Sequence, residues 1–478
     1  MYKLLIVEDE DMLREALLGS VDWTGMGYEV LGAEDGERAL AVTRAARILQ
    51  ENLRRDMGAD AMASIATLDA LNTAVRRAVD EATITDIHTH LFPPSHGDLL
   101  LWGVDELLTY HYLVAELFTV APADLTYEAF WAMDKIAQAD LVWKHLFLEA
   151  SPLSEARRGV LTVLQRLGLD PADRDLGRIR RWFARQDEEA YLEKVFDLAG
   201  LDYAVMTNNP VKCNEVKHFD AGAPIPARLR TALRIDDVVL NFASCRPIIA
   251  SQGCAAGDGT IEGAAAALRG WMGGWIDRID PVYMAASLPC SWAYPVDDAA
   301  TRMIDHVVCP LAVERGLPVA LMIGVNRQVN PALGDAGDAV APCDVNSIIR
   351  LVAAHPDVKF LVTTLSRVDQ HALAVAGRKF RNLHLFGCWW FCNNPSIINE
   401  MTRQRLELLG TGVTVQHSDA RVLDQLIYKW SHTRRIVADV LVDKYADAHH
   451  TGWRFTPAEI ARDVRQIFGG AFEDFRAR

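Results

Sequence analysis

From residue 84 onward, short apolar runs alternate with longer segments whose apolar residues recur three and four positions apart. The runs are mostly unbroken, which is typical of strands buried on both faces of a parallel sheet, and the longer segments are typical of helices. The runs cover residues 84–90, 203–208, 230–236, 282–289, 318–325, 359–365, 383–390 and 411–419. Eight buried strands that alternate with helices predict an α/β fold, a closed (β/α)8 TIM barrel.

The interval between the first and second predicted strands is long, from about residue 91 to 202. Its apolar residues keep helical spacing, so we predict a helical insertion after strand one. Residues 243–280 are interpreted as a loop that leads into the helix before strand four. The last segments of the chain are expected to form helices on the outside of the barrel.

Residues 1–40 follow another pattern and resemble the start of a two-component receiver domain. A first strand ends in the acidic cluster Glu8, Asp9 and Glu10, and a helix and a second strand at residues 28–36 follow. No later strand delivers a phosphoacceptor aspartate, because Asp56 follows a charged stretch. A fragment of this size is too small to bury a stable core of its own.

We therefore divide the chain into a truncated, non-functional leader, residues 1–60, and a barrel domain, residues 61–478. Met57 and Met62 are candidates for the natural start.

Composition and charge narrow the class of partner. A formal net charge of −15 disfavours nucleic acid and anionic membrane surfaces, but a few local arginines can still hold a small anionic substrate. The eight cysteines include no C-x-x-C pair, which indicates reduced thiols. Without a basic leader or an apolar run of membrane-spanning length, a cytoplasmic protein is expected. The oligomeric state stays open, a homo-oligomer included.

The first predicted strand ends in two histidines that are two positions apart. Asp86, His88 and His90 alternate along a strand, so their side chains are expected on the same face. Two imidazoles that converge at a strand end can hold a divalent metal. The alternative is that one or both are hydrogen-bonded core residues.

The last predicted strand repeats this pattern, because its apolar run ends in His417, Asp419 and Arg421. In a closed barrel the last strand lies beside the first, so the Asp419 carboxylate is expected next to the two imidazoles. Strands four to six offer no further ligand, and strand five carries Met322. Three protein ligands and an open position are typical of a single catalytic Lewis acid. His417 either orients Asp419 or is a ligand itself, and the first role is favoured.

Over about residues 65–478 the sequence resembles the shorter, Bacillus-type branch of the uronate isomerases in the amidohydrolase superfamily. The motifs that carry the resemblance are DIHTHLF, DELLTYHYLVAEL, ALRID, DPVYMAASLP, MIGVNRQVNPALGDAGD, FGCWWFCNNP and QHSDARVLDQLIYKW. The resemblance implies a barrel of the metal-dependent hydrolase type and an aldose–ketose isomerase. That family interconverts D-glucuronate with D-fructuronate and D-galacturonate with D-tagaturonate, by proton transfer between C2 and C1 through a cis-enediol.

The resemblance also implies roles for single residues. His88, His90 and Asp419 would hold one divalent metal, usually zinc in the family, and Asp419 would remove the C2 proton. Arg234 and Arg421 would bind the carboxylate of the hexuronate substrate, a task that suits guanidinium groups. Taken without the resemblance, both arginines read equally well as members of salt bridges at the barrel rim.

Three aromatic residues complete the predicted site. Tyr112 would polarise or protonate the oxygen at the reacting carbons, with His111 beside it on a sugar hydroxyl. By its spacing alone, Tyr112 reads as a core residue of a helix. Of Trp389 and Trp390 at the end of strand seven, one is expected to pack in the barrel, and Trp390 is the candidate to face the sugar.

The sequence departs from the longer uronate isomerases at strand five, where they carry a histidine in place of Met322. We interpret the methionine as a character of the shorter branch. Arg327, on the loop after this strand, is interpreted as a structural residue. The alternative function is a mononuclear metal-dependent hydrolase of the same superfamily, which the missing ligands on strands four to six disfavour.

Overall fold

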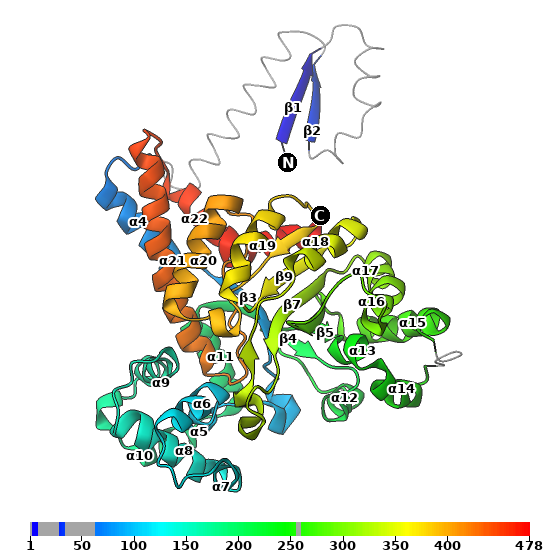
Figure 1. The fold of residues 1–478 in the computed structure, drawn as a ribbon. Coiled ribbons are helices and arrows are strands. Elements are labelled where there is room, and N and C mark those ends of the chain that lie inside the picture. The colour runs from blue at the N-terminus through cyan, green and yellow to red at the C-terminus, as the bar shows by residue number, and fades with distance from the viewer. Residues whose placement is uncertain (1, 8–27, 34–62, 255–259) are drawn as a thin grey trace.

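A barrel of parallel strands forms the centre of the protein (Figure 1). The computed structural model describes residues 2–7, 28–33, 63–254 and 260–478. Among these residues, parallel neighbours run in the order β3 (Ile84–Thr89), β4 (Leu201–Asn208), β5 (Leu229–Arg234), β6 (Met284–Pro289), β7 (Val319–Asn326), β9 (Phe360–Thr364) and β10 (Leu383–Leu385). A short strand, β8 (Ala339–Val340), pairs antiparallel with the end of β7.

The eighth position of the barrel is filled by an irregular segment, residues 413–420. On one side, the segment pairs with β10 and its extension: the Thr414 N–H donates to the Leu385 carbonyl, and the Thr414 carbonyl accepts from the Gly387 N–H. On the other side, the Asp419 N–H donates to the His88 carbonyl at 3.1 Å, and the His90 N–H donates to the Ala420 carbonyl at 2.8 Å. The segment therefore closes the barrel, as the sequence predicted.

The last two predicted strands are shorter than expected. The regular part of β10 ends at Leu385 because Gly387 turns the chain with φ +67°, and a 3-10 turn, η7 (Trp390–Cys392), follows. In the closing segment, Asp419 takes φ +52°, a left-handed conformation that interrupts extended pairing.

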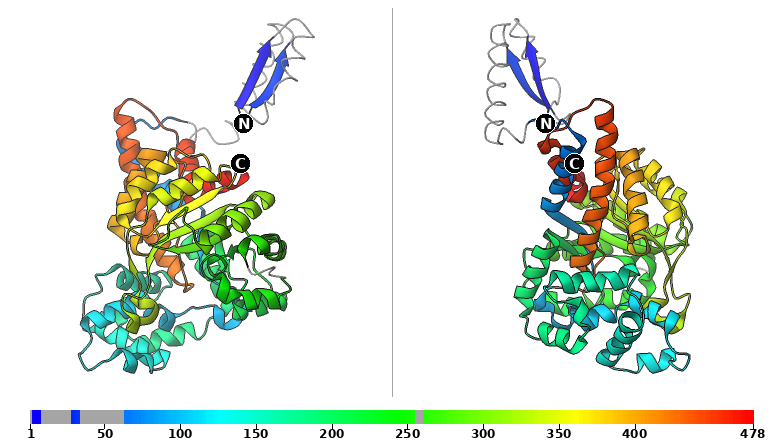
Figure 2. Two further views of the ribbon diagram at one scale, coloured as in Figure 1. Left: turned by 45° about the vertical axis from the view of Figure 1, so that its right-hand side comes forward. Right: turned by 90° about the vertical axis from the view of Figure 1, so that its left-hand side faces the viewer.

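The predicted helical insertion is confirmed between β3 and β4. It contains η1 (Pro94–Leu99), α5 (Val104–Leu108), α6 (His111–Val120), α7 (Tyr127–Trp131), α8 (Lys135–Trp143), η2 (Lys144–Leu148), α9 (Glu155–Arg166), η3 (Pro171–Asp173), α10 (Leu176–Phe183) and α11 (Glu188–Ala199). Side chains of Thr126, Asp134 and Ser154 cap the N-termini of α7, α8 and α9. Helices α5–α10 gather at one end of the barrel (Figures 1 and 2).

The prediction of a loop that begins at residue 243 is wrong. Residues Phe242–Ser251 form α14, and after residues 255–259, which lie outside the description, the chain continues as α15 (Ile261–Ile279). The helix contains Pro247, yet Phe242, Cys245 and Ile249 lie on one helical face and are buried. The burial of this apolar face outweighs the helix-breaking tendency of a single proline.

Helices on the outside of the barrel complete the domain. Helix α4 (Leu68–Glu81) precedes β3. Besides α14 and α15, the helical segments after β4 and before the tail include α12 (Cys213–Asp220), α13 (Asp236–Leu240), α16 (Ala299–Met303), η4 (Ile304–Val308), α17 (Cys309–Arg315), η5 (Pro331–Gly337), α18 (Val345–Ala354), η6 (Arg367–Asp369), α19 (Gln370–Gly377) and α20 (Pro395–Leu409). The tail forms the expected helices, namely α21 (Gln425–His450), α22 (Pro457–Arg465), η8 (Gln466–Gly470) and α23 (Ala471–Ala477). Phe472 and Phe475 of α23 join the apolar cluster inside the barrel.

In the leader, β1 (Tyr2–Val7) and β2 (Tyr28–Ala33) pair in parallel, with Tyr2 opposite Tyr28. Two strands in this order agree with the sequence pattern, whereas Glu8, Asp9, Glu10 and Asp56 lie outside the described residues. In the part of the chain that the structure describes, no helix is both long and apolar enough to cross a membrane.

Candidate active site

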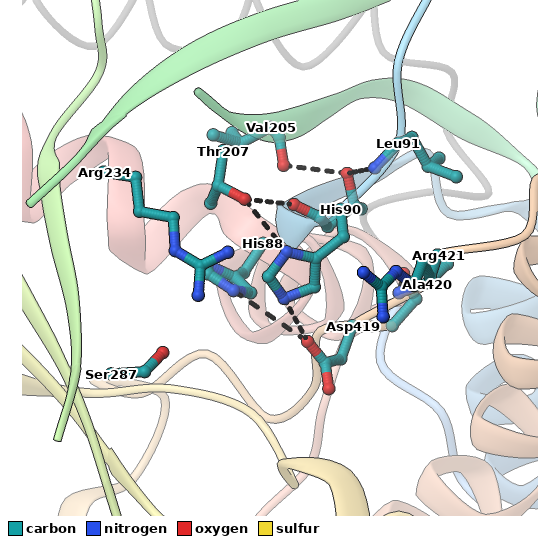
Figure 3. A network of polar contacts seen from close by, with 12 residues as sticks. His88, His90, Leu91, Val205, Thr207, Arg234, Ser287, Asp419, Ala420 and Arg421 are labelled. Carbon is teal, nitrogen blue, oxygen red and sulfur yellow. Dashed lines mark hydrogen bonds and ion pairs between the residues drawn. The ribbon is translucent and has the colours of Figure 1, made fainter. Parts of the chain in front are cut away.

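Closure of the barrel brings three predicted residues together. The ligand atoms of His88, His90 and Asp419 all lie within 4.8 Å of one another (Figure 3). Asp419 Oδ1 is 3.3 Å from Nε2 of His90 and 3.9 Å from Nε2 of His88. His88 is on β3, His90 directly follows it, and Asp419 is on the closing segment, so residues from both ends of the barrel domain meet.

Tyr283, which directly precedes β6, fixes the tautomer of His88. Its hydroxyl donates to the Ile87 carbonyl at 2.6 Å, so its oxygen must accept the hydrogen bond from Nδ1–H of His88 at 3.1 Å. The proton of a neutral His88 therefore lies on Nδ1, and Nε2 presents a lone pair. This Nε2 is buried and has no hydrogen-bond partner.

Thr207, at the end of β4, fixes His90 in the same way. Its hydroxyl donates to the Thr89 carbonyl at 3.3 Å and accepts from Nδ1–H of His90 at 3.1 Å. The Nε2 lone pair of His90 therefore faces the Asp419 carboxylate (Figure 3). In metal sites of proteins, the ring nitrogen that does not bind the metal commonly donates such a hydrogen bond, which orients the histidine ligand.

The three converging atoms form a cation site. Burial lowers the pKa of His88 well below its usual range and also lowers that of His90, so both imidazoles are neutral near pH 7. Two nitrogen lone pairs and a carboxylate oxygen then point at one another. This arrangement of acceptors is stabilised when a divalent cation lies between them. The residues present thus fit a metal with three protein ligands.

Two arginines flank this group from opposite sides in Figure 3. Arg234, at the end of β5, is paired with Asp236. Arg421 follows Asp419 by two positions, and its guanidinium is 3.2 Å from Asp335 and half exposed. Both arginines line one cavity of about 170 Å³ together with His90 and Asp419.

Aromatic residues form another wall of this cavity. His111, the first residue of α6, and Trp390 both line it, and their rings lie 5.2 Å apart. Trp389 belongs mainly to the apolar cluster inside the barrel. Tyr112 is not among the lining residues, and burial, with a smaller contribution from the charge of Asp419, raises the pKa of its hydroxyl well above the usual range. Tyr110 takes the lining position.

Asp86 does not share the site with the histidines, contrary to the sequence prediction. Its carboxylate accepts hydrogen bonds from the Ser418 N–H at 3.0 Å and from the Trp430 indole at 2.8 Å. The pairing register of β3 is irregular between Asp86 and Thr89, and this irregularity breaks the simple alternation of side chains.

The favoured role of His417 as a partner of Asp419 is also wrong. Neither ring nitrogen of His417 forms a hydrogen bond, and the ring lies 5.5 Å from that of His88 and 5.1 Å from that of Phe386. Gly387 makes room for it, since a Cβ there would lie 1.7 Å from the His417 Nδ1. His417 therefore packs behind the site.

Sequence reasoning missed several residues of the cavity and its support. The cavity is also lined by Tyr110, Ser287, Asp335 and Asp338. Arg327, interpreted as structural, pairs with Asp338 at 2.7 Å and lines the cavity as well. Thr207 could have been found, because a polar residue at the carboxyl end of a barrel strand is a candidate for the active-site face. Tyr283 carried no such signal.

Comparison with solved structures found close similarity over most of the chain. A uronate isomerase from Bacillus halodurans C-125 is 48% identical, with a TM-score of 0.85 over 87% of this chain and 98% of that one. A uronate isomerase from Thermotoga maritima is 14% identical, with a TM-score of 0.69 over 86% and 99% of the two chains. A glucuronate isomerase from Caulobacter crescentus is 15% identical, with a TM-score of 0.68 over 86% and 94%. The last two share the fold.

Comparisons with protein-family descriptions and with curated proteins found no match. None of the similar structures named above supports the receiver resemblance of the leader, which stays a prediction.

Proposed function

The chain belongs to the uronate isomerase family and is an aldose–ketose isomerase, and we propose that its cavity moves a proton between C2 and C1 of a hexuronate. The substrate pairs would be D-glucuronate with D-fructuronate and D-galacturonate with D-tagaturonate. One observation carries the proposal: two guanidinium groups and the three converging ligand atoms line or adjoin a single cavity. Such a cavity suits a small molecule that has a carboxylate at one end and a carbonyl at the other.

We propose that His88, His90 and Asp419 hold one divalent ion, with zinc the expected metal. Zinc commonly takes nitrogen and carboxylate ligands and keeps an open position in catalytic sites. When bound, the ion would supply Lewis acidity toward oxygens of the substrate. The hydrogen bonds that their Nδ1–H groups donate to Tyr283 and Thr207 keep the two imidazoles in the tautomer that this task needs.

Asp419 is proposed as the base that carries the proton. Its carboxylate would take the proton from C2 of the aldose and return it to C1 of the resulting cis-enediol, so that no net proton is gained or lost at carbon. The oxygen on C1 must gain a proton and the oxygen on C2 must lose one. We assign this exchange to Tyr112 and His111. His111 lines the cavity, and the ring of Tyr112, which is not among the lining residues, lies 4.6 Å from the ring of His111.

Arg234 and Arg421 are proposed to bind the substrate carboxylate, and Trp390 to face the sugar chain. Arg234 is held in place by Asp236, whereas Arg421 is half exposed and is paired with Asp335. This difference suits a fixed contact of Arg234 and an adjustable contact of Arg421 with the substrate carboxylate. A neutral hexose of similar size would leave both guanidinium groups without their anion.

The decisive experiment follows the carbons directly. The protein, reconstituted with zinc, is incubated with D-glucuronate, D-galacturonate and, as the uncharged control, D-glucose, and C1 and C2 are followed by NMR. We expect ketose formation from at least one hexuronate and none from glucose. The alternative function predicts instead the hydrolysis of lactones or amides without conversion of hexuronates, and that result would refute the proposal.

Replacing Arg421 by methionine is expected to raise KM by about 10- to 100-fold and to change kcat less, because a charge-assisted contact with the substrate carboxylate is lost. Steady-state kinetics with the preferred hexuronate measure both constants. Arg367→Met is the matched control, since Arg367 forms a surface ion pair with Glu400. A fall of kcat at constant KM would contradict the assignment.

Deleting residues 1–61 is expected to leave kcat/KM within about twofold, because every proposed site residue lies in the barrel domain and the similarity to the Bacillus protein covers 98% of that chain. The measurement compares kinetics and thermal unfolding of the two lengths. A shortened protein that is insoluble or inactive would assign the leader a structural role. The cytoplasmic location and the possibility of a homo-oligomer stay predictions.

A further inference from the structure

A lysine lies buried beside the site without a role in the proposed chemistry. Lys429, near the start of α21, is 3% exposed, and its Nζ donates a hydrogen bond to the Ser418 carbonyl at 2.5 Å. The same Nζ is 5.7 Å from the centre of the Tyr112 ring. Lysine is among the residues least often buried, so a buried ammonium group needs specific partners.

The carbonyl that Lys429 binds belongs to the peptide group joining Ser418 to Asp419. The N–H of this peptide group donates to the His88 carbonyl at 3.1 Å, so both of its polar atoms are held. The preceding N–H, of Ser418, donates to Asp86 at 3.0 Å. The plane of the peptide group is therefore fixed directly before Asp419.

The orientation of this plane sets the φ angle of Asp419. That angle is +52°, in the left-handed region, which few residues other than glycine adopt and in which asparagine and aspartate are the commonest exceptions. Strained backbone of this kind persists only where the surrounding contacts determine it. If the Ser418 carbonyl were released, Asp419 could relax toward extended backbone, and its carboxylate would turn away from His88 and His90.

We propose that Lys429 is a positioning residue, which aims the Asp419 carboxylate at the two histidines by holding the peptide group before it. Burial lowers the pKa of Lys429, and the charges of the buried Asp419 and Asp86 carboxylates oppose this shift. Through its position over the Tyr112 ring, the same side chain links the proposed base and the proposed phenol donor.

Two substitutions separate the hydrogen-bond donor of Lys429 from its charge. Lys429→Met keeps an unbranched apolar stem but removes the donor and the charge, whereas Lys429→Gln keeps an N–H donor on an uncharged side chain; both side chains are one atom shorter than that of lysine. Metal-free protein is titrated with Zn²⁺ by calorimetry, and the visible spectrum of the Co²⁺-loaded protein reports the ligand geometry.

We expect Lys429→Met to weaken Zn²⁺ binding by about 10- to 100-fold, the range found when residues that orient metal ligands are removed, and to alter the Co²⁺ spectrum. At saturating metal, kcat should fall by about 100-fold with KM within about threefold, because the arginines still hold the substrate. Lys429→Gln should lie between Lys429→Met and the unchanged protein in each measurement.

Val440→Ala is the matched control, because Val440 is fully buried on the same helix, 11 residues or about 16 Å further along. It should lower the unfolding temperature while Zn²⁺ affinity and kcat stay within twofold. If Lys429→Met likewise loses only thermal stability, the lysine is merely structural and the proposal is overturned.

If Lys429→Met fails to fold, Lys429→Gln decides, since unchanged Zn²⁺ affinity and spectrum in that variant would also overturn the proposal. The expected change of kcat in the Lys429→Met protein rests on the proposed function, whereas the Zn²⁺ titration needs no substrate. A protein that converts no hexuronate, yet loses metal affinity on Lys429→Met, would refute the proposed function and leave the role of Lys429 intact.

Discussion

Replacing Asp419 by asparagine is expected to lower kcat by at least about 10³-fold, equivalent to about 4 kcal/mol of transition-state stabilisation. Asparagine keeps the shape of the side chain but removes both the charge that faces His88 and His90 and the proton acceptor. The loss should persist when zinc is added in excess, because restoring the metal does not restore the base.

The measurement combines kcat with exchange of the C2 hydrogen in D2O. Asp424→Asn is the control, because Asp424 is a buried carboxylate of the same chain segment that accepts from Gly103 and Tyr191 and lies outside the cavity. It should cost stability while exchange continues. Near-native exchange in the Asp419→Asn protein would show that another group is the base.

Removing the metal is expected to have the second largest effect. Dialysis against a chelator should lower activity by at least about 100-fold, and one equivalent of zinc should restore it. The same treatment should lower the unfolding temperature, because an ion that binds only the folded protein stabilises it by mass action. The physical reason is the convergence of neutral His88 and His90 with a carboxylate, which lacks a balancing cation when the ion is removed.

Metal analysis of the purified protein, activity before and after chelation, and thermal unfolding measure these effects. Other divalent ions, added singly to the metal-free protein, identify the preferred metal. Full activity in protein shown to contain less than a few hundredths of an equivalent of metal would contradict the assignment of the ligands.

Prediction and structure differ at two residues of the strand-end pattern, Asp86 and His417, and agree at the other three. His88, His90 and Asp419 could be paired from the sequence because a closed barrel places its first and last strands side by side. Asp86 follows the same spacing rule and fails, since the rule assumes regular pairing and β3 is irregular at that point. His417 fails because its surroundings depend on Gly387, 30 positions earlier in the sequence.

The hydrogen-bonding roles of the supporting residues were beyond sequence reasoning for a related reason. Tyr283 and Thr207 act through hydroxyl groups whose donor and acceptor directions depend on carbonyls of another strand. Arg234 and Arg421, in contrast, could be assigned from the family motifs, and both line the cavity. A helix over Phe242–Ser251 was missed because its stability comes from burial against the barrel and outweighs Pro247.

The sequence by itself determined the order of strands and helices, the insertion after strand one and the ligand types at the strand ends, because apolar periodicity and local spacing are properties of neighbouring residues. Only the tertiary structure decided which lone pairs face the metal position, where Tyr112 lies, and that Lys429 holds the backbone before Asp419. Those features depend on side-chain directions that are set when the barrel closes, through contacts that span from 11 positions, between Lys429 and Ser418, to 195 positions, between His88 and Tyr283.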